Sequence, residues 1–435
     1  QILLSHWLKP FLGSGVWRKM AYLNATKGPN AILFGTGEYT TGLTPSGQAK
    51  SDKSLGVVGL TFFDLRARGK IGDRIALVGT SAEKESKIRD HFRDNLTFTN
   101  IGSKEFEFFP KSGKNPKAYE EAIKAFTPGD VCTVFTPDDT HFEICKAALQ
   151  GGLHVLVTKP MVKTLAQHKE LVGIAKEKGV LLQIEVHKRF DPIYNDARQR
   201  LQTLGNFGYF TSFMSQPKMQ LETFRDWAGI SSDISYYLNS HHVDFHVWAM
   251  QGIAKPVSVY ATASTGTAEK ILGRPCEDTI TLNVVWQNHS GSTGHALYTS
   301  SWTASKSDVH SQQRFFCQME TAEVTVDQAH RGYYVAEDGV GFNSCNPLFI
   351  RNKPDSMGRY VGQGCYGYIT FERFVEAASA ITKGSAKPSD FDTELPTGYS
   401  TLQVTAILEA GRKSLDENRV VTIIYDDQGE VDRLD

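Results

Sequence analysis

A lysine at the end of an apolar run is the side chain of this sequence best placed to do chemistry. Residues 154–157, His-Val-Leu-Val, lead into Thr158, Lys159 and Pro160. Such a run is typical of a buried parallel strand, and ligands of open α/β sheets bind where the carboxyl ends of these strands open. Lys159 is therefore a candidate for contact with both a cofactor and a substrate. The alternative is a surface lysine that merely follows a strand.

A glycine turn follows the first predicted strand. Residues 31–34 are apolar and lead into Gly-Thr-Gly. Glycines let the backbone approach a pyrophosphate while the amides of the next helix point at it. The third glycine of the usual fingerprint is replaced by Thr40, and the polar residues 41–53 that follow are either a flap over the cofactor phosphates or an idle loop. The residues of this turn that we predict to bind the cofactor are Gly35, Gly37, Glu38, Tyr39 and Thr40.

The second predicted strand, residues 74–78, ends without the carboxylate that NAD-preferring sites place against the ribose 2′-hydroxyl. It is followed instead by Thr80, Ser81 and Lys84, whose hydroxyl and ammonium groups could accept a 2′-phosphate. This pattern favours NADPH as the cofactor, with NADH as the alternative. The same residues would also serve as an ordinary N-cap for the next helix.

The elements that must position these residues follow a repeated strand–helix pattern. Helical stretches separate short apolar runs at 31–34, 74–78, 131–135, 154–157 and 180–186. This alternation predicts an N-terminal Rossmann domain, a doubly wound parallel sheet, over residues 28–190. Strand-like runs then follow one another until two late helices at 366–381 and 401–415. We therefore predict an α/β plus α+β protein, in which residues 191–435 form a second domain on a mostly antiparallel open sheet.

Composition narrows the class of protein. The chain has 435 residues, 40% of them hydrophobic, which suits two domains. Its net charge of −1 gives no excess of positive charge for binding nucleic acid. No apolar stretch approaches the roughly twenty residues of a membrane span. Six widely spaced cysteines favour a reduced, cytoplasmic protein without a metal site, whose partners are small molecules or other protein chains. Residues 1–27 are a predicted N-terminal extension, in which Met20 is a candidate natural start.

Several short motifs occur in the order and spacing of one oxidoreductase family. They are Gly35-Thr-Gly37, Thr136-Pro137-Asp-Asp-Thr-His141, Thr158-Lys159-Pro160, Lys188-Arg189-Phe190-Asp-Pro192 and His241-His-Val-Asp244. In these motifs the chain resembles the family of glucose-fructose oxidoreductase, inositol dehydrogenase and MocA (Gfo/Idh/MocA), from about residue 29 onward. The resemblance implies a nicotinamide dinucleotide at the edge of the Rossmann sheet, with Thr136, Pro137 and His141 beside it.

The same resemblance assigns roles in a reaction site. The family has a Glu-Lys-Pro motif whose lysine bridges the nicotinamide ribose and the substrate, and Lys159 has this place here, with Thr158 instead of the glutamate. The family also has an aspartate four residues before a histidine on a helix of the second domain. In this chain the histidine is His241 and the earlier residue is Tyr237, so the usual acid–base pair is altered while a hydroxyl is kept.

These side chains suit the reduction of a carbonyl by a hydride. Negative charge grows on the carbonyl oxygen, so the site needs a positioned cation and a proton donor. We expect Lys159 to be the cation and His241, as a group that titrates near neutrality, to be the proton donor, with Tyr237 one turn away to hold or replace it. The alternative for His241 is a structural hydrogen bond. The polar neighbours that favour a site are Asn239, Ser240, His242 and Asp244.

Segments such as residues 222–229 and 233–242 resemble the D-galacturonate reductase branch of the family. The implied substrate is the aldehyde form of a hexuronate, D-galacturonate or D-glucuronate, and the implied product is an aldonate such as L-galactonate, as in pectin catabolism. Paired donors of an arginine suit a substrate carboxylate, so Arg225 and Lys218 are the first choices, whereas Arg189 could equally be a hinge residue packed between the domains. The predicted substrate-binding residues are Lys188, Arg189, Lys218, Arg225, Asn239 and His242.

Two other functions stay open. An NAD-dependent dehydrogenase of a neutral sugar or cyclitol would keep Lys159 and His241 without needing Arg225. A nucleotide-binding regulator that kept the fold and lost catalysis would be consistent with Tyr237 in place of the family aspartate. We also expect a homodimer, because exposed faces of open antiparallel sheets commonly pair with another subunit.

Overall fold

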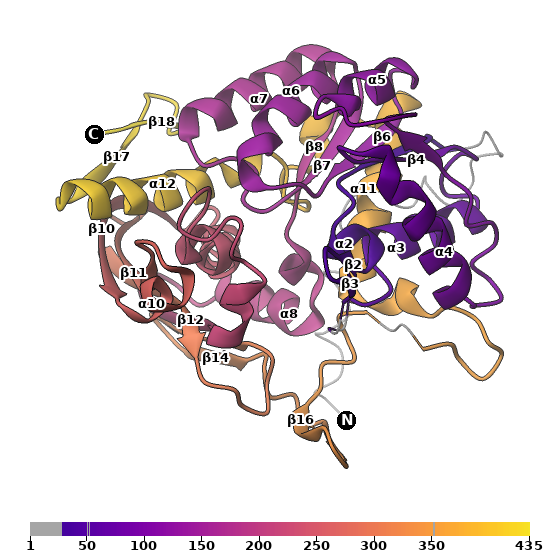
Figure 1. Ribbon diagram of the computed structural model, residues 1–435. Coiled ribbons are helices and arrows are strands. Elements are labelled where there is room, and N and C mark those ends of the chain that lie inside the picture. The colour runs from indigo at the N-terminus through magenta and orange to yellow at the C-terminus, as the bar shows by residue number, and fades with distance from the viewer. Residues whose placement is uncertain (1–27, 50, 52, 351–352) are drawn as a thin grey trace, which may run out of the picture.

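The computed structural model describes residues 28–435 except residues 50, 52, 351 and 352 (Figure 1). The predicted N-terminal extension, residues 1–27 with Met20 as its candidate start, lies outside the described residues. Two sheets with helices packed around them make up the described chain (Figure 1).

The first sheet is the predicted Rossmann sheet. Its strands are all parallel and run in the order β5-β4-β1-β6-β7-β8. The chain moves outward on one side of β1, then crosses back to begin β6 on the other side, so the switch point lies between β1 and β6. The strands are β1 (Ala31–Phe34), β4 (Ile75–Val78), β5 (Glu107–Phe109), β6 (Val131–Val134), β7 (His154–Thr158) and β8 (Leu182–Glu185).

Helices cover both faces of this sheet, as a doubly wound fold requires. On one face, Phe62 and Phe92 pack with Leu33 and Leu77 of the strands. This face is covered by α3 (Val58–Ala67), α4 (Glu85–Asn95) and α11 (Tyr366–Thr382), and the opposite face by α5 (Ala118–Lys124), α6 (His141–Gln150) and α7 (Leu165–Lys178).

Helix α11 comes from the C-terminal part of the chain but belongs to the Rossmann core. Its Phe371 and Phe374 are fully buried in the same cluster as Ala31 of β1. Residue 397 also forms a bridge with residue 183, which covers the open edge at β8. The predicted division at residue 190 therefore does not separate the two packing units, because the chain returns to the first sheet after completing most of the second.

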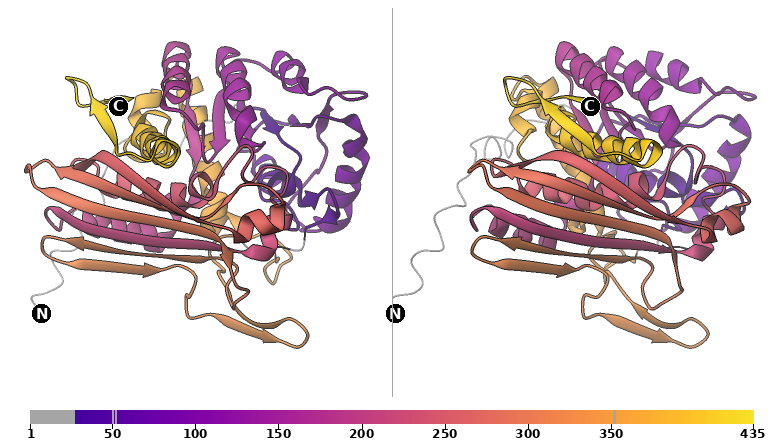
Figure 2. Two further views of the ribbon diagram at one scale, coloured as in Figure 1. Left: turned by 60° about the vertical axis from the view of Figure 1, so that its left-hand side comes forward. Right: turned by 90° about the vertical axis from the view of Figure 1, so that its left-hand side faces the viewer.

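The second sheet is mostly antiparallel, as predicted, with the order β14-β13-β9-β12-β11-β10-β17-β18. Only β9 and β12 among these described neighbours run parallel. Its strands are β9 (Phe207–Pro217), β10 (Ala254–Thr265), β11 (Glu277–Asn288), β12 (Thr293–Ala304), β13 (Gln312–Met319), β14 (Glu323–Asp327), β17 (Val421–Tyr425) and β18 (Val431–Leu434). Figure 2 shows α12 (Leu402–Glu417) lying across one face of this sheet, which α8 (Pro192–Leu201) and α9 (Ser240–Ala249) also cover.

One expectation near the glycine turn needs correction. The helix that begins at the glycine turn, α2 (Glu38–Thr41), has only four residues, and the next helix is α3, three residues later than the predicted start at Leu55. The inserted residues then form a hairpin, β2 (Leu43–Thr44) and β3 (Gly47–Gln48), before α3 begins. The remaining small elements are α10 (Thr267–Leu272) and the projecting hairpin of β15 (Tyr334–Glu337) and β16 (Gly341–Ser344).

Candidate active site

The glycine turn after β1 has room for a phosphate group. Gly35 has φ +102°, and a Cβ there would lie 2.0 Å from the carbonyl oxygen of Phe135. A Cβ on Gly37 would meet no heavy atom of the described residues within 4 Å. The turn thus presses against the end of β6 on one side and leaves space on the other, at the switch point of the sheet. This arrangement fits a dinucleotide pyrophosphate, which must approach backbone amides closely.

Two predicted members of this turn point into the protein. The Tyr39 ring stacks on the Phe135 ring with centroids 5.1 Å apart. Thr40 is 1% exposed. These two side chains therefore pack beneath the turn inside the protein, whereas the glycines lie on the side of the turn that is open to a ligand.

The insertion after the turn folds back onto it. Ser51 Oγ donates a hydrogen bond to Glu38 Oε1 at 2.5 Å, so Glu38 holds the insertion against α2. Lys53 Nζ lies 6.0 Å from the centroid of the Phe349 ring. The insertion therefore reaches from the phosphate end of the site toward the second part of the chain. That it acts as a flap over the phosphates stays a prediction.

The residues that follow β4 differ in role: one is buried and caps a turn, and others are exposed and free to contact a ligand. Ser81 is buried and its Oγ accepts a hydrogen bond from the Glu83 amide at 3.4 Å, so it caps the short turn η2 (Ala82–Lys84), as the N-cap alternative proposed. Thr80 and Lys84 are exposed. A β-bridge between residues 81 and 114 also places the exposed Lys114 at this strand end. A 2′-phosphate would meet hydroxyl and ammonium groups here.

His141 supports the carboxyl edge of the sheet from inside. Its Nδ1 lies 2.9 Å from the Pro160 carbonyl oxygen, and its Nε2 lies 2.8 Å from that of Thr136. The ring is fully buried. These contacts link the loops that follow β6 and β7, so the buried His141 ring supports the backbone of Thr136 and Pro160.

Lys159 lies against Tyr237. Its Nζ donates a hydrogen bond to the backbone carbonyl of Tyr237 and lies 4.1 Å from the centroid of the Tyr237 ring. Burial lowers the pKa of the Lys159 ammonium from 10.5 to about 8, and the nearby carboxylates of Asp138 and Glu185 oppose this shift. The lysine is therefore a half-buried cation that can release its proton near physiological pH.

Tyr237 lies on a π-helical turn, η6 (Ser235–Asn239), that precedes α9. Phe224 and Trp227 pack on its ring with centroids 5.2 and 5.3 Å away. The π turn shifts side-chain directions, so Tyr237 and His241 are not stacked as an uninterrupted α-helix would place them. π turns often occur at functional sites.

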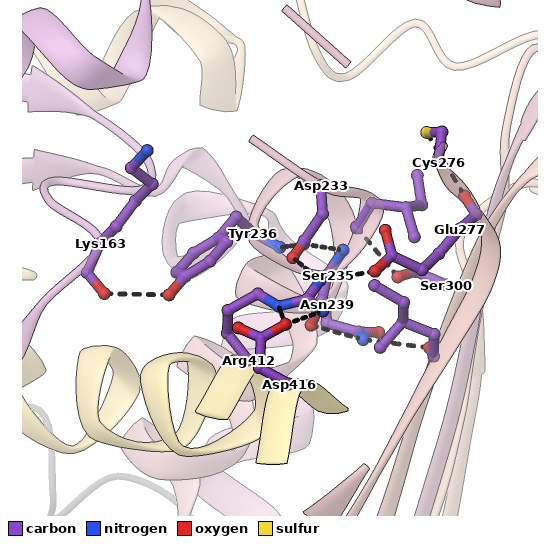
Figure 3. A network of polar contacts seen from close by, with 12 residues as sticks. Lys163, Asp233, Ser235, Tyr236, Asn239, Cys276, Glu277, Ser300, Arg412 and Asp416 are labelled. Carbon is purple, nitrogen blue, oxygen red and sulfur yellow. Dashed lines mark hydrogen bonds and ion pairs between the residues drawn. The ribbon is translucent and has the colours of Figure 1, made fainter. Parts of the chain in front are cut away.

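A polar network holds the π turn in place (Figure 3). Asp233 accepts hydrogen bonds from the amides of Ser235 and Tyr236 at 2.8 and 2.9 Å. The Arg412 guanidinium of α12 binds both Asp233, at 3.3 Å, and Glu277 of β11, at 2.7 Å (Figure 3). Elements far apart in sequence therefore fix the backbone that presents Tyr237.

His241 does not have the protonation behaviour expected from the sequence. It is 7% exposed, and burial, followed by the positive charges of Lys159 and Lys188, holds its pKa well below the usual range. Its Nδ1 makes no hydrogen bond with any described residue. The expectation that His241 titrates near neutrality is therefore wrong, because the imidazole is buried and the positive charges of two lysines add to the effect of burial. At neutral pH its imidazole is uncharged.

The structure adds two residues that the sequence did not single out. Glu185 ends β8, and His187 follows two residues later in the turn η4 (His187–Phe190). His187 Nδ1 lies 2.9 Å from Glu185 Oε1, and its ring centroid lies 5.4 Å from that of His241. Their position at the carboxyl end of a parallel strand beside β7 could have identified them from the sequence as candidate site residues.

The predicted basic residues have different surroundings. Arg189 is buried and pairs with Asp244 through two hydrogen bonds of 2.6 and 2.9 Å, which is the structural role that the sequence left open. Arg225 pairs with Glu222 at 2.7 Å and also donates to backbone carbonyls of residues 271 and 272. Lys218 is exposed at the start of η5 (Lys218–Glu222).

Lys188 is a buried cation. It is 1% exposed, and its Nζ donates to Oε1 of Gln313 at 2.5 Å and to Oε1 of Gln328. Burial lowers its pKa to about 7. Its position beneath the site makes it a source of positive potential near His241 rather than an open ligand for a carboxylate.

Asn239 and His242 point into the second core, which corrects their assignment to the substrate pocket. Asn239 Nδ2 donates to Ser235 Oγ at 3.1 Å. His242 is fully buried, and its Nε2 lies 2.9 Å from the hydroxyl of Tyr194. Both are polar core residues whose partners come from other elements.

Comparisons with known proteins match the Rossmann part of the chain by sequence. A sequence model described as "Oxidoreductase family, NAD-binding Rossmann fold" (Gfo/Idh/MocA) matches residues 69–186. The uncharacterized oxidoreductase YdgJ of Escherichia coli is 36% identical over 118 residues, which are 26% of this chain and 34% of YdgJ. The scyllo-inositol 2-dehydrogenase (NAD(+)) of Bacillus subtilis is 32% identical over 114 residues, 25% of this chain and 33% of that protein. Residues 69–186 thus match the Gfo/Idh/MocA oxidoreductase model, and the chain aligns with about a third of the length of these relatives.

Solved structures share the whole fold. GenD2 from gentamicin A biosynthesis, in complex with NAD, has a TM-score of 0.63 at 17% identity and covers 92% of this chain and 97% of its own. The scyllo-inositol dehydrogenase of Lactobacillus casei with NAD(H) and scyllo-inositol has a TM-score of 0.60 at 14% identity, over 91% and 99% of the two chains. At these identities the likeness establishes the fold, both sheets included.

The described residues contain neither a membrane-spanning helix nor a cluster of metal-ligand side chains. None of their helices is both long enough and apolar enough to cross a membrane. No cluster of three or more His, Cys, Asp or Glu side chains among them has the arrangement of a metal site.

Proposed function

We propose that the protein is an NADPH-preferring reductase that converts the aldehyde of a hexuronate, D-galacturonate first, to the aldonate. The observation that carries the proposal is the half-buried Lys159, whose ammonium is held against Tyr237 near His241 at the carboxyl edge of the Rossmann sheet. The bound NADPH would supply the hydride that adds to the carbonyl carbon. Gly35 and Gly37 would hold its pyrophosphate, and Thr80 and Lys84 its 2′-phosphate.

Lys159 would both stabilise and protonate the reacting oxygen. A buried ammonium next to a developing alkoxide is strongly attracted to it, because little water screens the two charges. Its pKa of about 8 is close to the working pH, which favours proton transfer to the product oxygen. The uncharged His241 would donate a hydrogen bond to the substrate and so orient the carbonyl. The rings of Phe224 and Trp227 would keep water from this side.

The substrate carboxylate is assigned to Lys218. Arg189 and Arg225 are each paired with a protein carboxylate, whereas Lys218 is exposed where β9 ends. Arg225 would position the loop that carries Phe224 and Trp227. We further propose a homodimer paired through the exposed face of the second sheet.

The pH dependence of uronate reduction follows from Lys159. Reduction needs the ammonium form, so kcat should fall as the pH rises through about 8, with a slope of one proton. The unfolded chain binds this proton more tightly than the folded protein, because the pKa is lowered on folding. The contribution of Lys159 to the free energy of unfolding therefore increases between about pH 8 and 10.5. Single-turnover rates and melting temperatures measured from pH 6 to 10 would show activity falling without loss of stability. A flat rate profile up to pH 10 would contradict the role of Lys159.

The proposed substrate is tested by NADPH oxidation with D-galacturonate, D-glucuronate and D-galactose. We expect kcat/KM to be at least about 100-fold higher for galacturonate than for galactose, because the neutral sugar leaves a binding cation without its partner. Lys84→Ala should weaken NADPH binding and leave NADH binding unchanged. Equal rates on the two sugars would refute the uronate assignment, and equal NADH and NADPH affinities in both proteins would refute the cofactor assignment.

A second candidate is an NAD-dependent dehydrogenase of a neutral sugar or cyclitol. Two ion pairs favour this candidate, Arg189 with Asp244 and Arg225 with Glu222. Each guanidinium already binds a protein carboxylate, so neither is available for the carboxylate of a uronate. The same assay with scyllo-inositol and NAD+ distinguishes the two functions.

A further inference from the structure

Glu185 and His187 form a hydrogen-bonded pair at the end of β8. Glu185 is 2% exposed, and its Oε1 lies 2.9 Å from His187 Nδ1. A carboxylate accepts hydrogen bonds only, so it fixes the imidazole tautomer that carries a proton on Nδ1. The other ring nitrogen, Nε2, is then the atom of His187 that can take up and release a proton.

The ring of His187 is held by aromatic groups from three elements. It stacks on Tyr366 of α11 at 5.7 Å and contacts Phe349 at 5.0 Å, in addition to His241 at 5.4 Å. The Tyr366 hydroxyl accepts hydrogen bonds from Gln328 and Asn346, both at 2.8 Å, so the stacking ring is itself fixed. The His187 side chain is 17% exposed, whereas His241 is 7% exposed. His187 is therefore the more exposed of the two adjacent rings.

The charged and titratable groups around the pair come from several elements. Glu185 faces His187 from β8, His241 from α9 and Tyr366 from α11. Glu185 also acts on Lys159, whose pKa it raises, and Lys159 in turn acts on His241. Lys188 adds a positive charge from the neighbouring position, and Lys53 approaches Phe349 from the insertion.

We propose that Glu185 and His187 are the proton relay that returns a proton to Lys159 through His241. This inference rests on the proposed reductase function, in which the half-buried Lys159 loses one proton in each turnover. The N–H bond of Lys159 breaks as the O–H bond of the product alcohol forms. His241 then passes a proton to Lys159 from one ring nitrogen and takes one from His187 Nε2 at the other, and a half-turn of the His241 ring restores the starting tautomer before the next substrate binds. Solvent then returns a proton to His187 Nε2, while Glu185 keeps the Nδ1 proton of the ring in place.

The relay is tested with Glu185→Gln and His187→Ala in the NADPH-dependent assay with D-galacturonate. His187→Ala should lower kcat about 10- to 100-fold at pH 7, because relayed proton delivery is lost, while KM changes less than about twofold. The solvent deuterium isotope effect on kcat should rise, the primary effect from 4-deuterated NADPH should fall, and added imidazole should restore part of the rate. Glu185→Gln should also shift the fall in rate near pH 8 to lower pH, because Lys159 loses a neighbouring negative charge.

A matched control is His289→Gln, which changes an exposed histidine in the turn between β11 and β12 and should alter none of these quantities. Unchanged isotope effects together with a lower melting temperature and no imidazole rescue would overturn the relay in favour of a packing role. A wild-type protein that reduces no uronate would instead contradict the proposed function. The pair would then be judged by NMR of histidine-labelled protein, where loss of the His187 Nδ1–H signal in Glu185→Gln supports the pairing and its persistence overturns it.

Discussion

Replacing Lys159 with methionine is expected to lower kcat for uronate reduction by about 10³-fold. The change removes the cation that stabilises the developing alkoxide and the proton that neutralises it, and each such group typically contributes a factor of about 10² or more. Methionine keeps a similar volume and removes a charge that burial makes costly, so the melting temperature should stay the same or rise. Steady-state kinetics and thermal unfolding of the same preparation would measure both effects.

The control for this substitution is Lys176→Met in the last turn of α7, where the lysine is exposed. It should leave both kcat and the melting temperature unchanged. If Lys159→Met kept more than about a tenth of the wild-type kcat, Lys159 would not be the acid, because a general acid contributes 10²-fold or more. Binding of NADPH to the variant without turnover would support the assignment.

The two glycines of the cofactor turn should respond differently to alanine. Gly37→Ala should leave folding intact, because Gly37 has φ −81° and its added Cβ would meet no described heavy atom within 4 Å. It should nevertheless weaken NADPH binding about 100-fold, which is roughly 2.7 kcal/mol, since the methyl group would occupy the space left for the phosphates. Isothermal titration calorimetry with NADPH would measure this loss.

Gly35→Ala should destabilise the protein itself. Its φ of +102° is unfavourable for alanine, and the Cβ would lie 2.0 Å from a backbone oxygen. Together these effects should lower the free energy of unfolding by about 2–4 kcal/mol in urea denaturation. Equal NADPH affinities of Gly37→Ala and wild type would place the phosphates elsewhere. Equal stabilities of Gly35→Ala and wild type would mean that the turn has a different conformation.

Most of the first sheet could be predicted because its signals are local. Apolar runs bounded by polar residues gave β1, β4, β6, β7 and β8, and the helices at 366–381 and 401–415 match α11 and α12 closely. The sheet against which α11 packs could not be predicted. The residue spacing of α11 indicates an apolar face, but it does not indicate which sheet that face contacts. The short edge strand β5 and the strand β13 carry too few distinguishing residues to be recognised locally.

The reaction site was predicted in part, for the same reason. Lys159, Tyr237 and His241 follow motifs, and the structure brings Lys159 and Tyr237 into contact. Asn239 and His242 were misassigned, and the role of Arg189 was left open, because the partners that make these residues structural lie on elements far away in sequence. The protonation of His241 depends on two lysines of other segments, so no local pattern could reveal it.

The most direct test of the central claim is a crystal structure of the protein with NADP+ and L-galactonate. We predict that the oxygen on the carbon that receives the hydride lies within hydrogen-bonding distance of Lys159 Nζ, with the His241 ring donating to the same sugar. The nicotinamide should stand at the carboxyl end of β7. A sugar bound with that carbon away from both side chains, or a nicotinamide on another edge of the sheet, would contradict the account.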